Sequence, residues 1–153
     1  MSYINKRRMG LYAGSFNPFH LGHLDVVKQA NEVFDAVLVA KLNNPEKNPE
    51  NFYRLPDKFL TDMSIYATTF DGLLVDLIKH WEHEFDITLV RGLRSGADLD
   101  YEQNFAAFLR GMYPQVKIVA FYCDPKLRHI SSSALRGIEK ISMDEYKKYV
   151  ISD

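Results

Sequence analysis

The chain has 153 residues, of which 46% are hydrophobic and 13% aromatic, and a formal net charge of −1 at pH 7, which predicts a single domain over residues 1–153 with one core. Its near-zero charge excludes a general electrostatic attraction to nucleic acid or to an anionic membrane, and no apolar run approaches the roughly 20 residues that span a bilayer. Its one cysteine, Cys123, excludes an intramolecular disulfide. The single cysteine, together with a polar N-terminal segment that makes a poor signal peptide, predicts a cytoplasmic protein.

The first elements alternate between strand and helix. A short apolar strand at 9–13 leads into a glycine-containing loop at 14–23. Apolar residues at helical spacing then predict a helix over 23–34 with one buried face. The continuous apolar run at 36–40 predicts a strand of a parallel sheet that is covered on both faces. The polar stretch that follows predicts a loop over 41–54, long enough to serve as a substrate flap.

The remaining chain continues this alternation. Further helices are expected at 55–66, 73–80 and 97–108, with strands at 87–90 and 116–122, then a helix capped by Ser131 that ends near residue 138, and a short helix at 143–150 within the C-terminal segment 139–153. Alternating strands and helices predict an α/β, Rossmann-like, doubly wound parallel sheet of about five strands. Ligands of such sheets bind at the carboxyl ends of the strands.

Basic and hydroxyl side chains follow the predicted strands at that edge of the sheet. The residues expected there are His20, His23, Lys47, Arg91, Arg94, Arg128, Ser131, Ser132 and Ser133. Guanidinium and ammonium groups neutralise phosphate charge, while hydroxyl and backbone N–H groups fix its geometry. The sequence therefore predicts a phosphate or nucleotide site in a chain of almost zero net charge.

Two of these residues, His20 and His23, lie one helical turn apart at a predicted helix N-terminus, where the helix dipole attracts anions. One alternative is a metal half-site, but zinc needs three or four ligands and no third ligand stands at a telling spacing. Another is a structural loop with two surface histidines. The chain has neither a P-loop motif nor a Gly-x-Gly-x-x-Gly motif, which favours transfer onto a bound phosphate acceptor by positioning and charge stabilisation.

Three motifs resemble those of known enzymes. Residues 14–23, Gly-Ser-Phe-Asn-Pro-Phe-His-Leu-Gly-His, resemble the T/H-x-G-H signature of the nucleotidyltransferase superfamily, and 130–133, Ile-Ser-Ser-Ser, resemble its second signature. Residues 91–102 resemble the corresponding segment of bacterial phosphopantetheine adenylyltransferases. The resemblance implies adenylyl transfer from ATP to 4'-phosphopantetheine, giving dephospho-coenzyme A and pyrophosphate.

The resemblance also implies a role for each matching residue. His23 would stabilise the transition state at the α-phosphate, with Lys47 and Arg94 as further catalytic groups. The acceptor contacts that it implies are Ser15, Lys47, Leu74 and Arg91. The ATP contacts that it implies are Ser15, Phe16, His20, His23, Gly92, Leu93, Arg94, Glu102, Leu127, Arg128, His129, Ile130, Ser131, Ser132 and Ser133.

Other implications concern partners. The resemblance implies Mg²⁺ held mainly by ATP phosphates and water, with no metal site on the protein, a homohexamer, and coenzyme A as a feedback ligand. Asn17 stands where the family has aspartate, and Ala134-Leu135-Arg136 is closer to some pyridine-mononucleotide adenylyltransferases. Adenylyl transfer to nicotinamide or nicotinate mononucleotide therefore stays open as an alternative. A catalytically silent nucleotide-binding protein is a second one.

Overall fold

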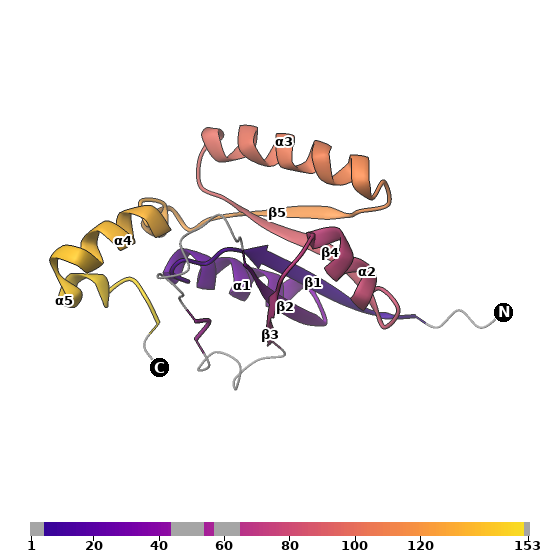
Figure 1. Cartoon of the computed structure of the whole chain (residues 1–153), viewed down its shortest axis with the longest axis horizontal. Helices are drawn as coiled ribbons and strands as arrows, with labels where there is room; N and C mark the ends of the chain where they lie inside the picture. Colours follow the sequence, from indigo (N-terminus) through magenta and orange to yellow (C-terminus); the bar gives the residue numbers. More distant parts are fainter. Residues whose placement is uncertain (1–4, 44–53, 57–64, 152–153) are drawn as a thin grey trace.

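A computed structural model of the chain describes residues 5–43, 54–56 and 65–151. These residues form one five-stranded sheet with the strand order β3-β2-β1-β4-β5, in which every neighbouring pair is parallel (Figure 1). The strands are β1 (Arg7–Gly14), β2 (Ala36–Leu42), β3 (Ile65–Phe70), β4 (Phe85–Leu93) and β5 (Ile118–Tyr122). The predicted Rossmann-like α/β fold is confirmed.

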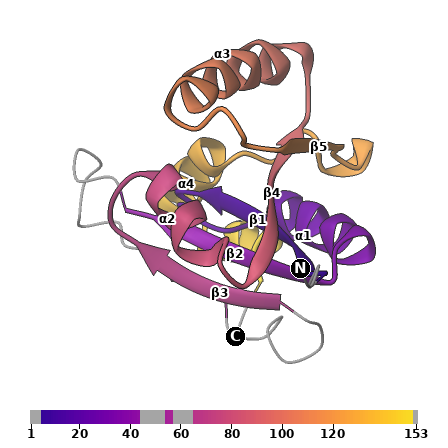
Figure 2. The same cartoon turned by 90° about the vertical axis from the view of Figure 1, so that its right-hand side faces the viewer.

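Helices connect β1 to β2, β3 to β4 and β4 to β5, and further helices follow β5. They are α1 (Leu21–Val33), α2 (Leu74–Trp81), α3 (Gly96–Met112), the 3-10 turn η3 (Pro125–Leu127), α4 (Ser132–Ile141) and α5 (Met143–Tyr146). Figure 1 shows α4 and α5 at the end of the sheet opposite the N-terminus, and in Figures 1 and 2 α3 lies beside β5, far from β3. Among the described helices none is long and apolar enough to cross a membrane.

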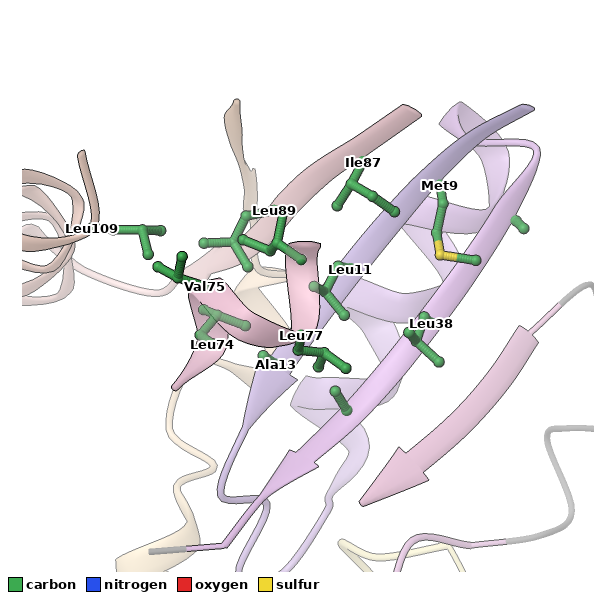
Figure 3. Packing of buried hydrophobic residues seen from close by; sticks show 13 residues of the cluster. Met9, Leu11, Ala13, Leu38, Leu74, Val75, Leu77, Ile87, Leu89 and Leu109 are labelled. Carbon is green, nitrogen blue, oxygen red and sulfur yellow. The ribbon is translucent and has the colours of Figure 1, made fainter. Parts of the chain in front are cut away.

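The central strands bury both of their faces, as their continuous apolar sequences predict. Residues alternate between the two faces of a strand. On one face of the sheet Leu11 of β1 and Leu89 of β4 therefore pack in one cluster with Leu77 of α2 (Figure 3). On the other face Val37 and Val39 of β2 pack with α1. A sheet covered in this way leaves its strand ends as the place where polar groups can meet a ligand.

A third cluster joins the last helices to the loop that precedes them. Ile130, Leu135 of α4 and Tyr146 of α5 are buried together. The segment after α5 returns to the start of α1, where the Leu21 N–H donates to the Tyr149 carbonyl at 2.9 Å and His20 forms an antiparallel bridge with Val150. The segment after α5 is therefore hydrogen-bonded to the residues at the start of α1.

The predicted helix at 55–66 is wrong wherever the structure describes it. Residues 55 and 56 are not helical, and 65 and 66 begin β3. This strand pairs with β2 from Val37↔Ile65 to Leu42↔Phe70. Sequence periodicity misses it because an edge strand buries only part of its side chains, whereas hydrogen bonding to β2 decides its conformation.

Other boundaries also shift. Lys41 and Leu42 belong to β2 rather than to the predicted loop, because β3 and β1 extend the ladder to them. Arg91 lies inside β4 and not after it, since β5 pairs with β4 up to Leu93. The last helix ends at Tyr146 instead of residue 150, where the return to α1 begins. β5 starts at Ile118, two residues later than predicted.

Gly10 provides a test of the packing between β1 and the end of α1. A Cβ added there would lie 2.6 Å from Cδ2 of the Phe34 ring and 3.0 Å from Cγ2 of Val90. We expect Gly10→Ala to lower the free energy of unfolding by about 1–3 kcal/mol through overpacking. Gly111→Ala is the control, because nothing lies within 4 Å of that Cβ in α3, and it should raise stability by about 0.5–1 kcal/mol. Urea denaturation of both variants measures the two signs.

Candidate active site

A cavity of about 750 Å³ opens at the carboxyl ends of the central strands, between the N-termini of α1 and α4. The predicted site residues that line it are Ser15, Phe16, His20, His23, Leu74, Arg91, Gly92, Arg94, Glu102, Ser131, Ser132 and Ser133. They come from segments up to 118 positions apart along the chain, from Ser15 to Ser133. The parallel sheet brings them together, as predicted from the strand ends.

The two histidines cap α1 reciprocally. Nδ1 of His20 accepts from the Gly22 N–H at 3.0 Å, and Nδ1 of His23 accepts from the His20 N–H at 3.1 Å. Their rings are stacked, with centroids 3.7 Å apart. Gly22 is necessary for this arrangement, since a Cβ there would lie 2.8 Å from Cε1 of His20. The caps satisfy backbone donors that a helix N-terminus otherwise leaves open.

Both imidazoles are neutral at neutral pH. Burial, and secondarily the positive charge of Arg94, lowers the pKa of His20 from 6.5 to about 4. Burial, then His20 and Arg94, lowers the pKa of His23 well below its ordinary value. A neutral ring whose Nδ1 accepts a hydrogen bond carries its proton on Nε2. The pair therefore offers two Nε2–H donors rather than two cations.

Arg91 of β4 lines the cavity, and residues of α3 and β1 hold its guanidinium group. Its Nε and Nη2 donate to the two carboxylate oxygens of Glu102 at 2.7 and 2.8 Å, and its Nη1 donates to the Ala13 carbonyl at 3.0 Å. The guanidinium also lies 4.6 Å from the centroid of the Phe105 ring. A bidentate pair fixes the plane of the guanidinium, so Arg91 is oriented before any ligand enters.

Arg94 links β4 to the segment before α4. Its Nε donates to Oδ2 of Asp98 at 3.1 Å and its Nη1 donates to the Ile130 carbonyl at 3.0 Å. Burial raises the pKa of Asp98, but the hydrogen bonds from Arg94 outweigh it and hold this pKa below its ordinary range. Arg128 donates from Nε to the Arg94 carbonyl at 2.8 Å. Hydrogen bonds thus join the end of β4 to the segment between β5 and α4.

The serines are positioned by α4. Ser131 is the N-cap, as predicted, and its side chain accepts from the Ala134 N–H. Ser132 donates from Oγ to the Pro18 carbonyl at 3.0 Å, and Arg136 donates from Nη1 to the Asn17 carbonyl at 2.7 Å. The N-terminus of α4 therefore abuts the loop of the first histidine motif.

Several predicted site residues lie outside the lining of this cavity. They are Leu93, Leu127, Arg128, His129 and Ile130, and Lys47 lies outside the described residues. Ile130 is buried in the cluster with Leu135, and His129 is exposed with its ring near that of Tyr149. Leu93 accepts from the Cys123 N–H through its carbonyl. The segment 127–130 thus contacts Arg94, which lines the cavity, through the Ile130 carbonyl and the Arg128 side chain.

Other residues line the cavity without having been predicted. Tyr12, Asp98 and Cys123 are among them. Burial raises the pKa of Tyr12, so its hydroxyl stays protonated. Arg94 and Asp98 are four residues apart across the start of a helix, and this spacing could have predicted their ion pair from the sequence. In the described part of the chain, no three His, Cys, Asp or Glu side chains gather to hold a metal ion.

Comparison with known proteins decides the family. Residues 11–138 match the family model described as cytidylyltransferase-like. The phosphopantetheine adenylyltransferase of Clostridium perfringens (strain SM101 / Type A) is 34% identical over 148 residues, which cover 94% of this chain and 88% of that protein. That of Alkaliphilus metalliredigens (strain QYMF) is 30% identical over 142 residues, covering 90% and 88%. The chain belongs to the phosphopantetheine adenylyltransferase family.

Solved structures agree on the fold. A putative nicotinate-nucleotide adenylyltransferase from Vibrio parahaemolyticus matches with a TM-score of 0.63 at 22% identity, covering 95% of this chain and 94% of that one. A bifunctional NMN adenylyltransferase/ADP ribose pyrophosphatase from Francisella tularensis, complexed with AMP and a manganese ion, matches with a TM-score of 0.62 at 16% identity, covering 96% and 45%. The family shares its fold with these enzymes.

The lowered histidine pKa values predict how stability depends on pH. Between pH 7 and 5 the unfolded chain binds a proton at an imidazole of ordinary pKa 6.5, whereas folded His20, with a pKa of about 4, does not. The free energy of unfolding therefore falls as the pH falls, by about 1–2 kcal/mol for this residue. His20→Asn keeps an N-cap acceptor without the titration, so it should lose this part of the pH dependence.

Chemical denaturation at pH 5, 6 and 7 measures the effect. The matched control is His83→Asn, at an exposed position after α2, which should leave the pH dependence as in the wild type. Parallel curves for the wild type and His20→Asn would contradict the burial of a neutral imidazole at residue 20.

Proposed function

We propose that the protein transfers the adenylyl group of ATP to 4'-phosphopantetheine, giving dephospho-coenzyme A and pyrophosphate. The observation that supports this most is the meeting of two neutral histidine donors and an oriented Arg91 in one cavity. The relatives of the family are named for the same activity. The acceptor, the assembly and the role of each residue below are parts of the proposal.

The reaction needs no nucleophile from the protein. A phosphate oxygen of the acceptor forms a bond to the α-phosphorus of ATP, while the bond from that phosphorus to the bridging oxygen breaks and its electrons leave with pyrophosphate. Two anions approach each other in this step. The site must therefore neutralise charge on both sides and donate to the oxygens that gain charge at the α-phosphorus.

The described residues divide these tasks. Arg91 binds the acceptor phosphate with the N–H groups that Glu102 and Ala13 leave open, and Leu74 contacts the acceptor arm. His20 and His23 donate from Nε2 to the ATP phosphates, with His23 acting on the α-phosphate in the transition state. Arg94 and the serines at the start of α4 bind the remaining nucleotide. Lys47 is proposed to hold the reacting phosphates from the flap, on the resemblance alone.

Magnesium is proposed to enter with ATP. The two carboxylates that line the cavity, Asp98 and Glu102, are paired with Arg94 and Arg91. This donor set suits an ion that is coordinated by phosphate oxygens and water, which Mg²⁺ favours. When bound, the ion supplies neutralisation of the charge on pyrophosphate.

The assembly is also a proposal. Helix α3 buries only Leu109 among its 17 residues, while Leu99, Phe108 and Met112 are exposed by 46%, 77% and 51%. Phe108 and Met112 lie four residues apart and therefore share one face of α3, and an exposed apolar surface of this kind is typical of a contact between copies. This surface supports a homo-oligomer. The family resemblance implies that the oligomer is a homohexamer. Cytoplasmic localisation and coenzyme A as a feedback ligand belong to the same proposal.

An acceptor panel tests the activity. The purified protein with ATP and Mg²⁺ should release pyrophosphate with 4'-phosphopantetheine. Nicotinate and nicotinamide mononucleotides are the necessary comparison, because residues 134–136 resemble the matching segment of some pyridine-mononucleotide adenylyltransferases. Arg136 of this segment contacts the Asn17 carbonyl in the first motif. Consumption of a pyridine mononucleotide with 4'-phosphopantetheine untouched would replace the acceptor. ATP binding without pyrophosphate release for any acceptor would favour a silent binding protein.

His23→Ala tests the transition-state role. We expect kcat to fall by about 10²- to 10³-fold, because one donor to the developing charge is lost, while ATP affinity changes by a few-fold. His23→Asn retains an acceptor for the His20 N–H and lacks the Nε2 donor, so it should lose similar activity with less effect on stability. Equal losses in ATP affinity and kcat would show a ground-state contact instead. His80→Ala, on the exposed face of α2, is the control.

A further inference from the structure

Lys41 is a buried cation that the sequence places at the start of the predicted flap without a contact to a ligand. It is 3% exposed and lies near the end of β2, paired with Gly14 at the end of β1. Because residues of a strand alternate, it continues the row of Val37 and Val39 on the α1 face of the sheet. It does not line the cavity. Burial of a lysine is costly unless its ammonium group is well bound.

The ammonium group binds three consecutive residues of the loop after β1. Its Nζ donates to the Ser15 carbonyl, to the Phe16 carbonyl at 3.4 Å, and to Oδ1 of Asn17 at 2.6 Å. An ammonium group has three N–H donors. The three acceptors therefore converge on Nζ from one short stretch of chain, which fixes the path of the loop over the end of β2.

This loop has a backbone conformation that needs support. Phe16 has a φ of 45°, in the left-handed region that a residue with a side chain rarely adopts. Its ring is held on two sides, 5.2 Å from the Tyr12 centroid and 4.9 Å from that of His23. Nζ of Lys41 donates to the carbonyl of Phe16. The ring contacts and the lysine thus determine the conformation together.

We infer that Lys41 is a positioning residue, which acts through loop 15–17 to set Ser15 and His23 for the phosphates of ATP. The inference rests on the proposed function for the identity of the ligand. Ser15 lines the cavity while its carbonyl accepts from Nζ of Lys41, and the ring of His23 packs on Phe16. A change in the loop at Phe16 therefore moves both groups.

The amide at position 17 fits this role. Its Oδ1 accepts from Lys41 without adding a negative charge beside the site. The Asn17 carbonyl also accepts from Arg136 of α4. Asn17 consequently contacts both Lys41 of β2 and Arg136 of α4, and its neutral amide does not repel a polyphosphate as a carboxylate would.

The test uses Lys41→Met, which keeps the length and apolar stem of the side chain, and Lys41→Arg, which keeps the charge. Lys28→Met, at an exposed position of α1, is the matched control. ATP binding is measured by calorimetry, and kcat and KM are measured by pyrophosphate release, both well below the unfolding temperature. We expect Lys41→Met to weaken ATP binding and to lower kcat/KM for ATP by about 10- to 100-fold, because small displacements of positioned groups have effects of this size. Lys41→Arg should restore part of both.

Each outcome is decisive. Unchanged ATP affinity and kinetics in folded Lys41→Met would overturn the inference, even if its Tm fell. If that variant does not fold, Asn17→Ala removes one acceptor and leaves the lysine, and it must weaken ATP binding for the inference to stand. Failure of the wild type to release pyrophosphate with any acceptor would refute the proposed function alone, because ATP binding still reports on Lys41.

Discussion

The start of α1 is capped by two imidazoles that exchange hydrogen bonds with its own backbone, and this exchange determines what the cavity can offer a ligand. It uses the Nδ1 atom of His20 and of His23, so their protons lie on Nε2. Because the rings are stacked and buried, they stay neutral and act as donors. Cationic charge at the site must therefore come from other elements.

Helix α3 supplies the orientation of that charge. Asp98 and Glu102 lie four residues apart, on one face of the helix. Asp98 pairs with Arg94, which follows β4 directly, and Glu102 pairs with Arg91 of β4. Each guanidinium is thus held by a carboxylate before ligand binding, which reduces the reorganisation needed when phosphate arrives. Oriented N–H donors, rather than an overall positive charge, are therefore what these residues offer a phosphate in a chain with a net charge of −1.

The sequence predicts this arrangement where local signals and the parallel topology agree. Continuous apolar strands, the loop before α1 and the Ser131 cap are all local features, and the sheet then brings their ends to one edge. The strand β3 could not be found in this way. Its residues are partly exposed, and pairing with β2 decides their conformation. Missing β3 also placed Lys41 in a loop instead of a strand.

That single error hides the role of the lysine. A lysine after an apolar run usually indicates the beginning of a polar loop, and only the pairing of β2 with β1 and with β3 shows that position 41 is still within the sheet. Once it is in the strand, alternation directs its side chain to the face of Val37 and Val39, where the loop after β1 crosses. A buried cation in that place needs acceptors, and the carbonyls of Ser15 and Phe16 and Oδ1 of Asn17 provide them. The hydrogen bonds that support loop 15–17 therefore depend on the register of the sheet, and no motif within the loop predicts them.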